Sequence, residues 1–422
     1  MRNRVVVTGM GVCAPNGIGL PAFGESLSTG KSGIAWIDEL KRLKFSCQIA
    51  GLPNIGVINL NDYFTSVQLK GLNSNGLVYG VIAGMDAWQD AGLRIADAPD
   101  WDSGTVFGTG ILGVDKFREA IYKVDAGEVR RLGSTTVVQT MASGISAFLG
   151  GKLGLGNQVT TNSSACTTGT EAVLMGYDTI ANGKAKRMLV GSCSDSGPYV
   201  WGGFDAMRIL PTKFNDTPTK ASRPMSATAS GFVPGSGAGA LVLESLDSAL
   251  QRKAKIYAEI MGGAVNSGGH RNGGSITAAN PVGVQKCISM AIENSGINGK
   301  DVDAINGHLT ATTKDPDEIG NWSMALGRSG LDFPYINSFK GHFGHCLAAS
   351  GSIECVGTVL QFKAKQLFGT LNCEDVHPKI LEVADQSKIV AQTLAYQPKI
   401  IAKASFGFGD VNACVIFKAY LQ

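Results

Sequence analysis

The sequence predicts an α/β protein built from two similar α/β units. Short β-branched runs alternate with longer helical stretches, and the alternation starts again after about residue 250. The 56 glycines lie along the whole chain without a repeat period, which favours tight turns between closely packed elements over disorder. With 422 residues, 44% of them hydrophobic, the chain can bury a large core.

In the first half, apolar runs predict strands at residues 5–8, 105–107, 158–160 and 187–190. Helical stretches lie before or between them, at 69–92, 136–154 and 166–182. Strands separated by helices are expected to be joined by right-handed crossovers. The stretch 213–239 is dense in Pro, Ser, Thr and Gly, so we expect it to wrap the surface or border a site.

The second half repeats this order. Strands are predicted at 256–261, 302–306, 400–405 and 412–419, and helices at 282–295, 315–326 and 347–364. The charged stretch around 250–256 separates the two series. We therefore expect an N-terminal half at residues 1–253 and a C-terminal half at residues 254–422.

Composition excludes several classes of protein. A net charge of +3 is too small to suggest nucleic acid as the main partner. The apolar run at the N-terminus is too short for a signal peptide, and no stretch approaches the roughly 18 apolar residues of a membrane helix. The nine cysteines occur singly, without a Cys-x-x-Cys pair, which favours reduced thiols over disulfides or zinc. A cytoplasmic protein without a membrane span is expected.

A glycine-rich motif, Gly108-Thr-Gly-Ile-Leu-Gly113, follows a predicted strand. A dinucleotide site would use such glycines to bring the backbone close to a pyrophosphate. The same pattern also suits a tight turn between a strand and a helix, and glycine is abundant throughout this chain. We favour the turn.

The segment Asn162-Ser-Ser-Ala-Cys-Thr-Thr-Gly-Thr170 follows a predicted strand and opens a predicted helix. Cys166 would there meet unpaired backbone N–H groups and the positive end of the helix dipole, which favour a nucleophilic thiolate. The other interpretation is a small buried apolar residue, the usual state of a single cysteine. The motif alone does not separate the two.

Two histidine-containing loops favour the nucleophile. His308 lies in a Gly-flanked loop after a predicted strand, and His345 follows Lys340 by five residues at the start of a predicted helix. Three of the five histidines fall in these two loops. Because no carboxylate or second histidine has a helical i, i+4 partner here, a metal site is not predicted.

Cys166, His308, Lys340 and His345, in this order and context, resemble the elongating β-ketoacyl-acyl-carrier-protein synthases of the thiolase superfamily. The resemblance covers nearly the whole chain, from the first strand to Ser405-Phe-Gly-Phe-Gly. It implies a thiolase-like fold, in which two duplicated α/β halves form a five-layered αβαβα core.

The resemblance also implies a mechanism. Cys166 would take an acyl chain from a thioester, with the backbone N–H groups of Cys166 and Phe408 as oxyanion hole. A malonyl-carrier protein would then lose carbon dioxide. His308 and His345 would stabilise the enolate, which attacks the acyl group, and Lys340 would orient the site electrostatically.

Further roles are carried over by position. Glu318 matches the residue that pairs with Lys340, and Thr310 and Thr312 match hydroxyls that hold the phosphopantetheine arm. Phe204 and Phe408 match residues that line or gate the acyl channel. No bound cofactor is implied, because phosphopantetheine arrives on the carrier protein.

The implied partners are an acyl carrier protein, malonyl and acyl thioesters, and a second subunit. The subunit would be identical, giving a homodimer, or related, giving a heterodimer. Residues that match the family's carrier-docking surface are Lys70, Arg130, Arg131 and Arg208. The alternative for each is an ordinary solvated charge.

Two departures from the family pattern are visible. Ser226, Ala229, Ser230 and Ser236 replace four charged residues, which suggests that an ion network is missing. The loop 312–318 is one residue shorter than usual. A ketosynthase of a specialised polyene or polyketide pathway therefore stands beside one of fatty-acid synthesis.

Other members of the superfamily fit less well. A non-catalytic chain-length partner subunit would lack the nucleophile that Cys166 supplies. Degradative thiolases resemble a one-histidine arrangement with a second cysteine near the C-terminus, where this chain has Gly407-Phe-Gly-Asp. Initiating synthases use Cys-His-Asn, whereas His345 fills the third position here.

Overall fold

The computed structural model describes residues 2–95 and 97–420. Eleven strands form one mixed sheet in the order β11-β10-β14-β15-β9-β1-β8-β7-β5-β6, with β2 added beside β1. These strands are β1 (Val5–Ala14), β2 (Gly17–Ile18), β5 (Ser103–Thr109), β6 (Val159–Thr160), β7 (Arg187–Ser194), β8 (Gly237–Ser245), β9 (Ala258–Ser267), β10 (Ala304–Asn306), β11 (Tyr335–Asn337), β14 (Ile400–Gly407) and β15 (Val411–Ala419).

The first strand joins the two halves. β1 pairs antiparallel with β8 and with β9, so that Val5 faces Ser245 on one side and Ile260 on the other. Away from this centre, β5 runs parallel to β6 and β7, and β10 runs parallel to β11 and β14. The two series predicted from the sequence thus lie on opposite sides of β1.

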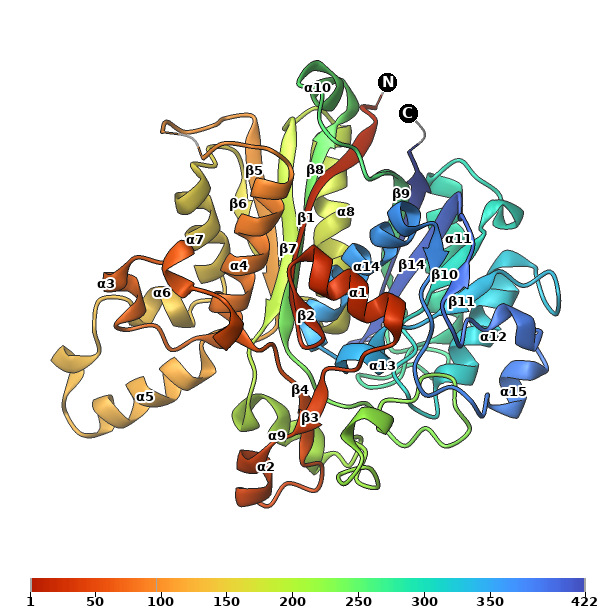
Figure 1. The fold of residues 1–422 in the computed structure, drawn as a ribbon, viewed down its shortest axis with the longest axis horizontal. Coiled ribbons are helices and arrows are strands. Elements are labelled where there is room, and N and C mark those ends of the chain that lie inside the picture. Colours follow the sequence, from red (N-terminus) through yellow and green to blue (C-terminus); the bar gives the residue numbers. More distant parts are fainter. Residues whose placement is uncertain (1, 96, 421–422) are drawn as a thin grey trace.

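Helices form three layers around the sheet (Figure 1). The outer layers are α4 (Asn75–Asp90) and α7 (Gly144–Leu153) on the N-terminal side, and α11 (Pro281–Asn294) and α12 (Asp315–Leu326) on the C-terminal side. Between the two halves lie α8 (Thr168–Ala181) and α14 (Ser350–Ala364), whose side chains pack in one core with strands from both sides. The three helical layers and the two halves of the sheet, which meet at β1, make up the predicted five layers.

The two central helices approach each other through glycines. A Cβ atom on Gly169 would lie 2.3 Å from the backbone nitrogen of Ser352, and one on Gly351 would lie 2.6 Å from that of Thr170. Only glycine permits such close backbones. Because the segments with Cys166 and His345 lead directly into these helices, the close crossing brings the two segments together.

Two predicted helices are interrupted. The helix expected at 69–92 is α4, which begins only at Asn75, after the short α3 (Ser66–Leu69), and residues 136–154 form α6 (Thr136–Thr140) and α7. The Gln139 side chain explains the first break: it accepts a hydrogen bond from Asn73 N and donates one to Gly71 O, which holds the linker as a loop. Contacts of this kind, 66 or more residues apart, leave no local sequence signal.

The predicted surface stretch 213–239 is only partly at the surface. Residues 231–239 are buried, and the strand β8 begins inside the stretch at Gly237, between β1 and β7. Although Ser226, Ala229, Ser230 and Ser236 carry no charge, the stretch still contains ion pairs, from Arg223 to Glu374 at 3.0 Å and to Asp375 at 2.9 Å. The polar composition of the stretch serves buried turns as well as exposed ones.

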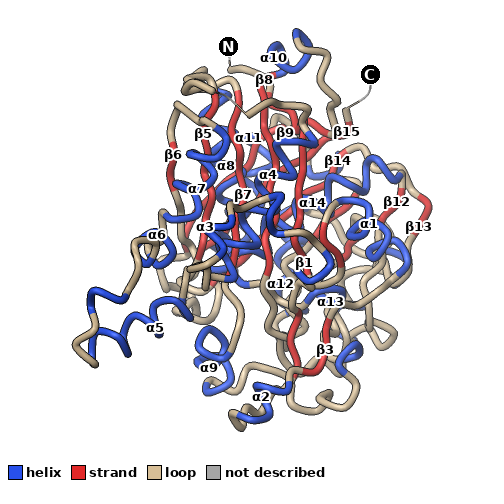
Figure 2. Tube along the Cα trace, turned by 60° about the vertical axis from the view of Figure 1, so that its left-hand side comes forward, coloured by secondary structure: helices blue, strands red, loops and turns tan. Residues whose placement is uncertain are grey.

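An unpredicted helix, α5 (Val114–Asp125), projects from the body of the molecule (Figure 2). The smaller elements are α1 (Leu20–Thr29), α2 (Asp38–Arg42), α9 (Pro198–Ala206), α10 (Leu246–Gln251), α13 (Lys340–Phe343), α15 (Pro378–Leu381), β3 (Ile34–Trp36), β4 (Ile49–Gly51), β12 (Gln366–Leu367) and β13 (Leu394–Ala395). Within residues 2–95 and 97–420, no helix is long and apolar enough to cross a membrane.

Candidate active site

Cys166 lies on a 3-10 turn, Ala165–Thr167, that leads into α8 at Thr168. The turn is tight: Ala165 has φ 48°, and the hydroxyls of Thr167 and Thr168 donate to the carbonyl oxygens of Ser164 and Ala165 at 2.6 and 2.7 Å. The predicted helix start at Cys166 is therefore two residues early. As a residue, Cys166 is partly exposed, whereas the other eight cysteines are buried.

His308 lies just after β10, in a loop held by a buried carboxylate. Glu318, on α12, accepts hydrogen bonds from His308 N and Leu309 N, each at 2.7 Å. The loop adopts left-handed backbone conformations at Leu309 (φ 27°) and Ala311 (φ 63°). Such conformations persist only where neighbouring contacts hold them. Glu318 thus fixes the loop that carries the imidazole.

A second buried carboxylate holds the same loop. Asp315 accepts from Met225 N at 2.8 Å, from Thr310 N at 3.0 Å and from Ala311 N at 3.2 Å. Burial raises the pKa of Asp315 to about 6 and the pKa of Glu318 to about 7, against the backbone N–H groups that lower both. Both carboxyl groups are therefore structural supports of the His308 loop.

His345 is fixed from both sides of its ring. Its Nδ1 lies 2.9 Å from Ser350 Oγ, at the start of α14, and its backbone N donates to Val233 O at 2.7 Å. The Phe232 ring packs against the imidazole, edge to face, with the centroids 5.0 Å apart. If the serine hydroxyl donates to Nδ1, the proton of the neutral ring is on Nε2, where it can be donated to a ligand.

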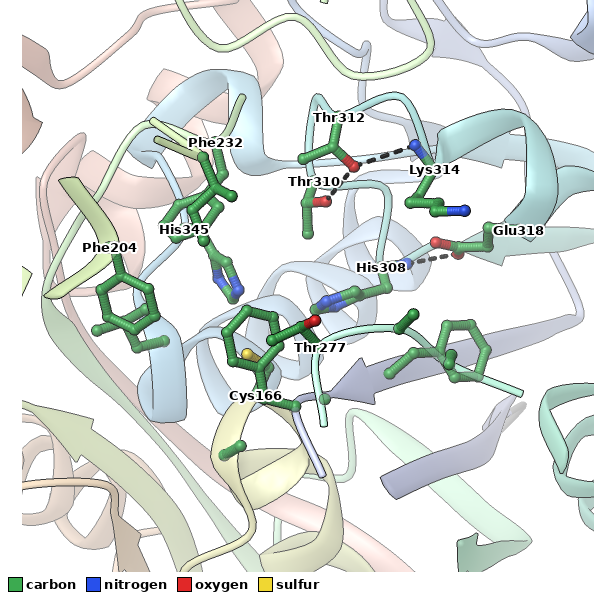
Figure 3. A pocket seen from close by; sticks show the side chains of 18 of the residues that line it. Cys166, Phe204, Phe232, Thr277, His308, Thr310, Thr312, Lys314, Glu318 and His345 are labelled. Atoms are coloured by element: carbon green, nitrogen blue, oxygen red, sulfur yellow. Dashed lines mark hydrogen bonds between the residues drawn. The ribbon is translucent and has the colours of Figure 1, made fainter. Parts of the chain in front are cut away.

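The three side chains converge (Figure 3). The Cys166 sulfur and one nitrogen of each imidazole lie within 4.8 Å of one another, and the two imidazole centroids are 5.4 Å apart. They line a cavity of about 680 Å³. A thiol and two imidazoles could also hold a metal ion. Backbone donors beside the thiol, which a metal site does not need, favour nucleophilic chemistry instead.

These backbone donors are the N–H groups of Cys166 and Phe408, both of which lower the pKa of the thiol by hydrogen bonding. Gly407 keeps them accessible, because a Cβ atom there would lie 3.1 Å from Cys166 N. Two N–H groups aimed at one point suit the oxyanion of a tetrahedral intermediate.

Both imidazoles are neutral at physiological pH. Burial lowers the pKa of His308 and that of His345 well below the usual value, and the positive charge of Lys340 lowers both further. A neutral imidazole carries one N–H that it can donate. The pair is thus suited to donate two hydrogen bonds to negative charge that develops between them.

The expected thiolate of Cys166 is wrong for the free protein. Burial raises the pKa of the thiol to about 11, although Lys340 and the two backbone N–H groups lower it. The helix start favours a thiolate, but the loss of water around the sulfur disfavours the charged form and has the larger effect. At neutral pH the group is a thiol.

Lys340 lies behind the cavity and is 1% exposed. Its Nζ donates to His308 O at 2.6 Å and forms an ion pair with Glu354, on α14. The partner implied by the family resemblance, Glu318, binds backbone N–H groups instead. Glu354 was not predicted, because it lies in a helix of mostly small and apolar residues, where no local pattern indicates a functional carboxylate.

The predicted substrate-binding residues surround the cavity. Phe204, Thr310, Thr312, Glu318 and Phe408 all line it. The hydroxyls of Thr310 and Thr312 are 3.1 Å apart, and the rings of Phe204 and Phe408 pack with centroids 6.2 Å apart.

Phe232 also lines the cavity and was not predicted. Its ring packs against Phe204, with centroids 5.5 Å apart, as well as against His345. The only local signal for Phe232 was its place in the stretch 213–239, which we expected to wrap the surface or border a site.

The predicted docking residues are not part of this cavity. All four are exposed, and none of them lines the cavity: Lys70, Arg130, Arg131 and Arg208. Arg131 pairs with Glu128 at 2.6 Å, on the segment that follows the projecting α5. Arg208 is adjacent in sequence to Met207 and Ile209, which do line the cavity.

The glycine-rich motif is a turn. Gly113, at φ 69°, precedes α5, and Val114 N donates to a carboxylate oxygen of Asp195 at 2.7 Å. A second oxygen of Asp195 accepts from Gly76 N at 2.6 Å. The carboxylate occupies the place where a pyrophosphate would bind, and its negative charge would repel one.

Alkylation with iodoacetamide tests the accessibility of Cys166. We expect peptide mapping to show labelling of Cys166 before Cys47 and Cys193, because only Cys166 is partly exposed. Burial raises the pKa of Cys47 to about 11 as well, so exposure and not thiolate fraction decides the order between Cys166 and Cys47. The rate at Cys166 should rise about tenfold per pH unit up to its pKa near 11. Earlier labelling of Cys47 would contradict the assignment.

The layered fold and a cysteine flanked by two neutral imidazoles define a condensing enzyme of the thiolase superfamily. The profile of the β-ketoacyl synthase N-terminal domain matches residues 2–249, and that of the C-terminal domain matches residues 257–374. The chain therefore belongs to the β-ketoacyl synthase family.

Individual relatives agree with this. The chain is 32% identical to 3-oxoacyl-[acyl-carrier-protein] synthase I, chloroplastic, of Arabidopsis thaliana, over 99% of this chain and 87% of that protein. It is 31% identical to 3-oxoacyl-[acyl-carrier-protein] synthase 2 of Vibrio cholerae, over 99% of both.

Solved structures have the same fold. A β-ketoacyl synthase from Burkholderia phymatum superimposes with a TM-score of 0.89 at 27% identity, over 99% of this chain and 100% of the other. A type II PKS acyl-carrier protein in complex with its ketosynthase bound to the hexaketide gives a TM-score of 0.87 at 27% identity, over 100% of both chains.

Proposed function

We propose that this protein is a 3-oxoacyl-[acyl-carrier-protein] synthase, which condenses a Cys166-bound acyl chain with a malonyl unit on a carrier protein. The observation that carries the proposal is that Cys166 lines the cavity beside two neutral imidazoles and two backbone N–H donors. The named relatives are 3-oxoacyl-[acyl-carrier-protein] synthases, which supports the same reaction for this chain.

In the first half-reaction, the Cys166 sulfur attacks the acyl carbonyl of a carrier-bound thioester. The carbonyl oxygen becomes an oxyanion and accepts hydrogen bonds from the N–H groups of Cys166 and Phe408. Collapse of the intermediate releases the carrier thiolate. This thiolate takes up the proton that Cys166 loses, so acyl-Cys166 and the free carrier thiol are formed.

In the second half-reaction, malonyl-carrier protein loses carbon dioxide. The electron pair of the broken C–C bond moves into an enolate, whose oxygen lies between His308 and His345 and accepts a hydrogen bond from each. The enolate carbon attacks acyl-Cys166, and the thiolate of Cys166 leaves and takes up a proton from water. The product is a 3-oxoacyl-carrier protein. The released carbon dioxide makes the condensation favourable.

The phosphopantetheine arm would reach this site from the mouth of the cavity, past Thr310 and Thr312. The carrier itself supplies this group, so the chain's residues bind and orient it without holding a resident cofactor. The aromatic rings of Phe204, Phe232 and Phe408 offer an apolar surface to the acyl chain.

Several finer assignments accompany the proposal. The halves would meet at residues 253/254, between the end of β8 and the start of β9. A second subunit, identical or related, would cover exposed apolar side chains of α5 such as Phe117, Ile121 and Tyr122. A cytoplasmic location is supported by nine free cysteines. The pathway would be fatty-acid or polyene/polyketide synthesis.

The proposal is tested by incubating the purified protein with an acyl-carrier protein and malonyl-carrier protein. We expect 3-oxoacyl-carrier protein and one carbon dioxide per condensation, measured by mass spectrometry and ¹⁴C release. An intact-protein mass shift equal to the acyl group, mapped to Cys166, would identify the intermediate. Carbon dioxide release without carbon–carbon bond formation would contradict condensation.

Carrier docking gives a separate prediction. Reversing two exposed charges, in Arg130→Glu/Arg131→Glu, should raise the apparent KM for an acyl-carrier substrate on the order of tenfold at low salt, because carrier proteins are generally acidic. The KM for a small acyl thioester should not change. High salt should reduce the difference between wild type and variant.

A matched control is Arg94→Glu/Lys184→Glu, which makes the same change in net charge at other exposed residues. Equal losses with both substrates in the Arg130/Arg131 variant would show a folding defect or no docking role. An equal rise in KM in the control would show that only the overall charge matters.

A further inference from the structure

A second buried lysine lies behind the site. Lys403, on β14, is 0% exposed, and its Nζ is 2.9 Å from Glu354 Oε2. The other oxygen of Glu354 pairs with Lys340. One fully buried carboxylate is thus shared by two buried lysines, and the cluster carries one positive charge in excess.

This excess charge is not explained by pairing. Lys340 and Glu354 alone would form a neutral buried pair, and removing a further ammonium group from water is strongly unfavourable. Lys403 instead uses its hydrogen-bond donors on the oxygen of Ala404 and on Ser405 Oγ, the latter at 3.0 Å. Packing does not require a cation there either, because the core around it is apolar on both sides of β14.

The cluster is connected to the reacting groups. Ser405 Oγ lies 2.9 Å from Thr170 Oγ1, in the first turn of α8 and four residues after Cys166. Lys340 Nζ contacts the carbonyl oxygen of His308. β14 continues from Lys403 to Gly407, directly before the Phe408 N–H. The excess positive charge is therefore placed behind the point where negative charge develops.

We propose that Lys403 is a positioning residue of the condensation site: it orients Glu354 and supplies the excess positive charge that stabilises the thiolate of Cys166 and the enolate. The proposal rests on the proposed function for the enolate, but not for the thiolate. Lys403 lowers the pKa of His308 and of His345, which shows that its charge reaches the cavity.

The cluster has defined neighbours. The charged and titratable groups that face it are Lys340 from α13, Glu354 and Cys355 from α14, Cys414 from β15, and, on the cavity side, Cys166, His308 and His345. Burial keeps Cys355 and Cys414 as neutral thiols by raising the pKa of each. The net charge is thus set by the two lysines and Glu354.

A charge series tests this with iodoacetamide as the only reagent. Below its pKa, the alkylation rate of Cys166 is proportional to its thiolate fraction. Lys403→Met removes the excess charge and should slow alkylation between pH 7 and 9 on the order of fivefold to tenfold, a shift of about one pKa unit or less. Glu354→Gln should accelerate it, because Glu354 raises the pKa of Cys166. Lys403→Met/Glu354→Gln restores the net charge and should return the rate toward that of wild type.

If Lys403 had only a structural role, the alkylation rates of the variants would follow a different pattern. Its loss would not be compensated by Glu354→Gln, and the double variant would resemble Lys403→Met or be worse. If Lys403→Met does not fold, the double variant should still react more slowly than Glu354→Gln alone, since the two differ only in the charge and shape of residue 403. Equal rates in that pair, or no rescue in the double variant, would overturn the proposal.

Malonyl decarboxylation provides the readout for the enolate. Lys403→Met should reduce malonyl decarboxylation by a larger factor than acyl transfer to Cys166 at the same pH, and the double variant should recover decarboxylation. If the alkylation series behaves as expected but no variant, wild type included, decarboxylates malonyl-carrier protein, then the proposed function fails while the electrostatic role of Lys403 stands.

Discussion

Cys166→Ala is expected to lose condensation activity by on the order of ten-thousandfold or more, as is usual when a covalent nucleophile is removed. The intact-protein mass should then show no acyl adduct. Of the nine cysteines, Cys166 is the one with partial exposure, and its sulfur shares the cavity with His308 and His345. The other thiols are buried and cannot replace it.

The control is Cys287→Ala, which removes a buried thiol on α11 whose sulfur donates to Ala264 O at 3.4 Å. This variant should keep its acyl adduct and its activity, with some loss of thermal stability from the smaller side chain. Acylation of Cys166→Ala at another residue, or full activity without an adduct, would contradict the covalent mechanism.

The second large effect concerns the histidines. His308→Ala and His345→Ala should each keep measurable acyl transfer to Cys166 and lose malonyl decarboxylation, on the order of a hundredfold to a thousandfold for one lost donor. Acyl transfer needs the thiolate and the backbone N–H groups, whereas decarboxylation needs the imidazole N–H groups. The two half-reactions are measured separately, by adduct mass and by ¹⁴CO₂ release.

His270→Asn serves as the control, because His270 is exposed and its backbone φ of 53° suits asparagine. It should leave both half-reactions unchanged. Removing His345 also leaves Ser350 without its imidazole partner, so thermal melting must accompany the kinetics. A His308 or His345 variant that decarboxylates at the rate of wild type would show that its assigned role is wrong.

The lowered pKa of both imidazoles simplifies the interpretation of these variants near pH 7. Because burial and Lys340 keep His308 and His345 neutral, protonation of the pair does not limit decarboxylation near pH 7. Loss of activity in either variant at that pH then reports the missing donor and not a changed titration.

Much of the fold could be predicted from the sequence, because periodicity and turn residues act locally. The helix expected at residues 315–326 is α12, Asp315–Leu326, and the strands expected at 400–405 and 412–419 are β14 and β15. The loops with Cys166, His308 and His345 were recognised from the residue types and the elements on either side. Local signals also placed these three at strand ends and helix starts, where sites form.

Local patterns failed where distant segments decide the structure. Gln139 breaks the helix expected at 69–92 from about 66 residues away, and β8 is a central strand although its first residues look like a turn-rich loop. The partner of Lys340 was predicted to be Glu318 and is Glu354. In each case the structure depends on contacts between segments that are far apart in the sequence.

By itself, then, the sequence determined the α/β order, the three candidate side chains of Cys166, His308 and His345, and the family resemblance, since each depends on residue identity and near neighbours. Only the tertiary structure decided their ionisation and pairing. Cys166 is a thiol with a pKa of about 11 and not a ready thiolate, and Lys403 stands as a second cation beside Glu354. Both facts depend on burial, because the free energy of a charge is set by the water it loses and the charges it meets.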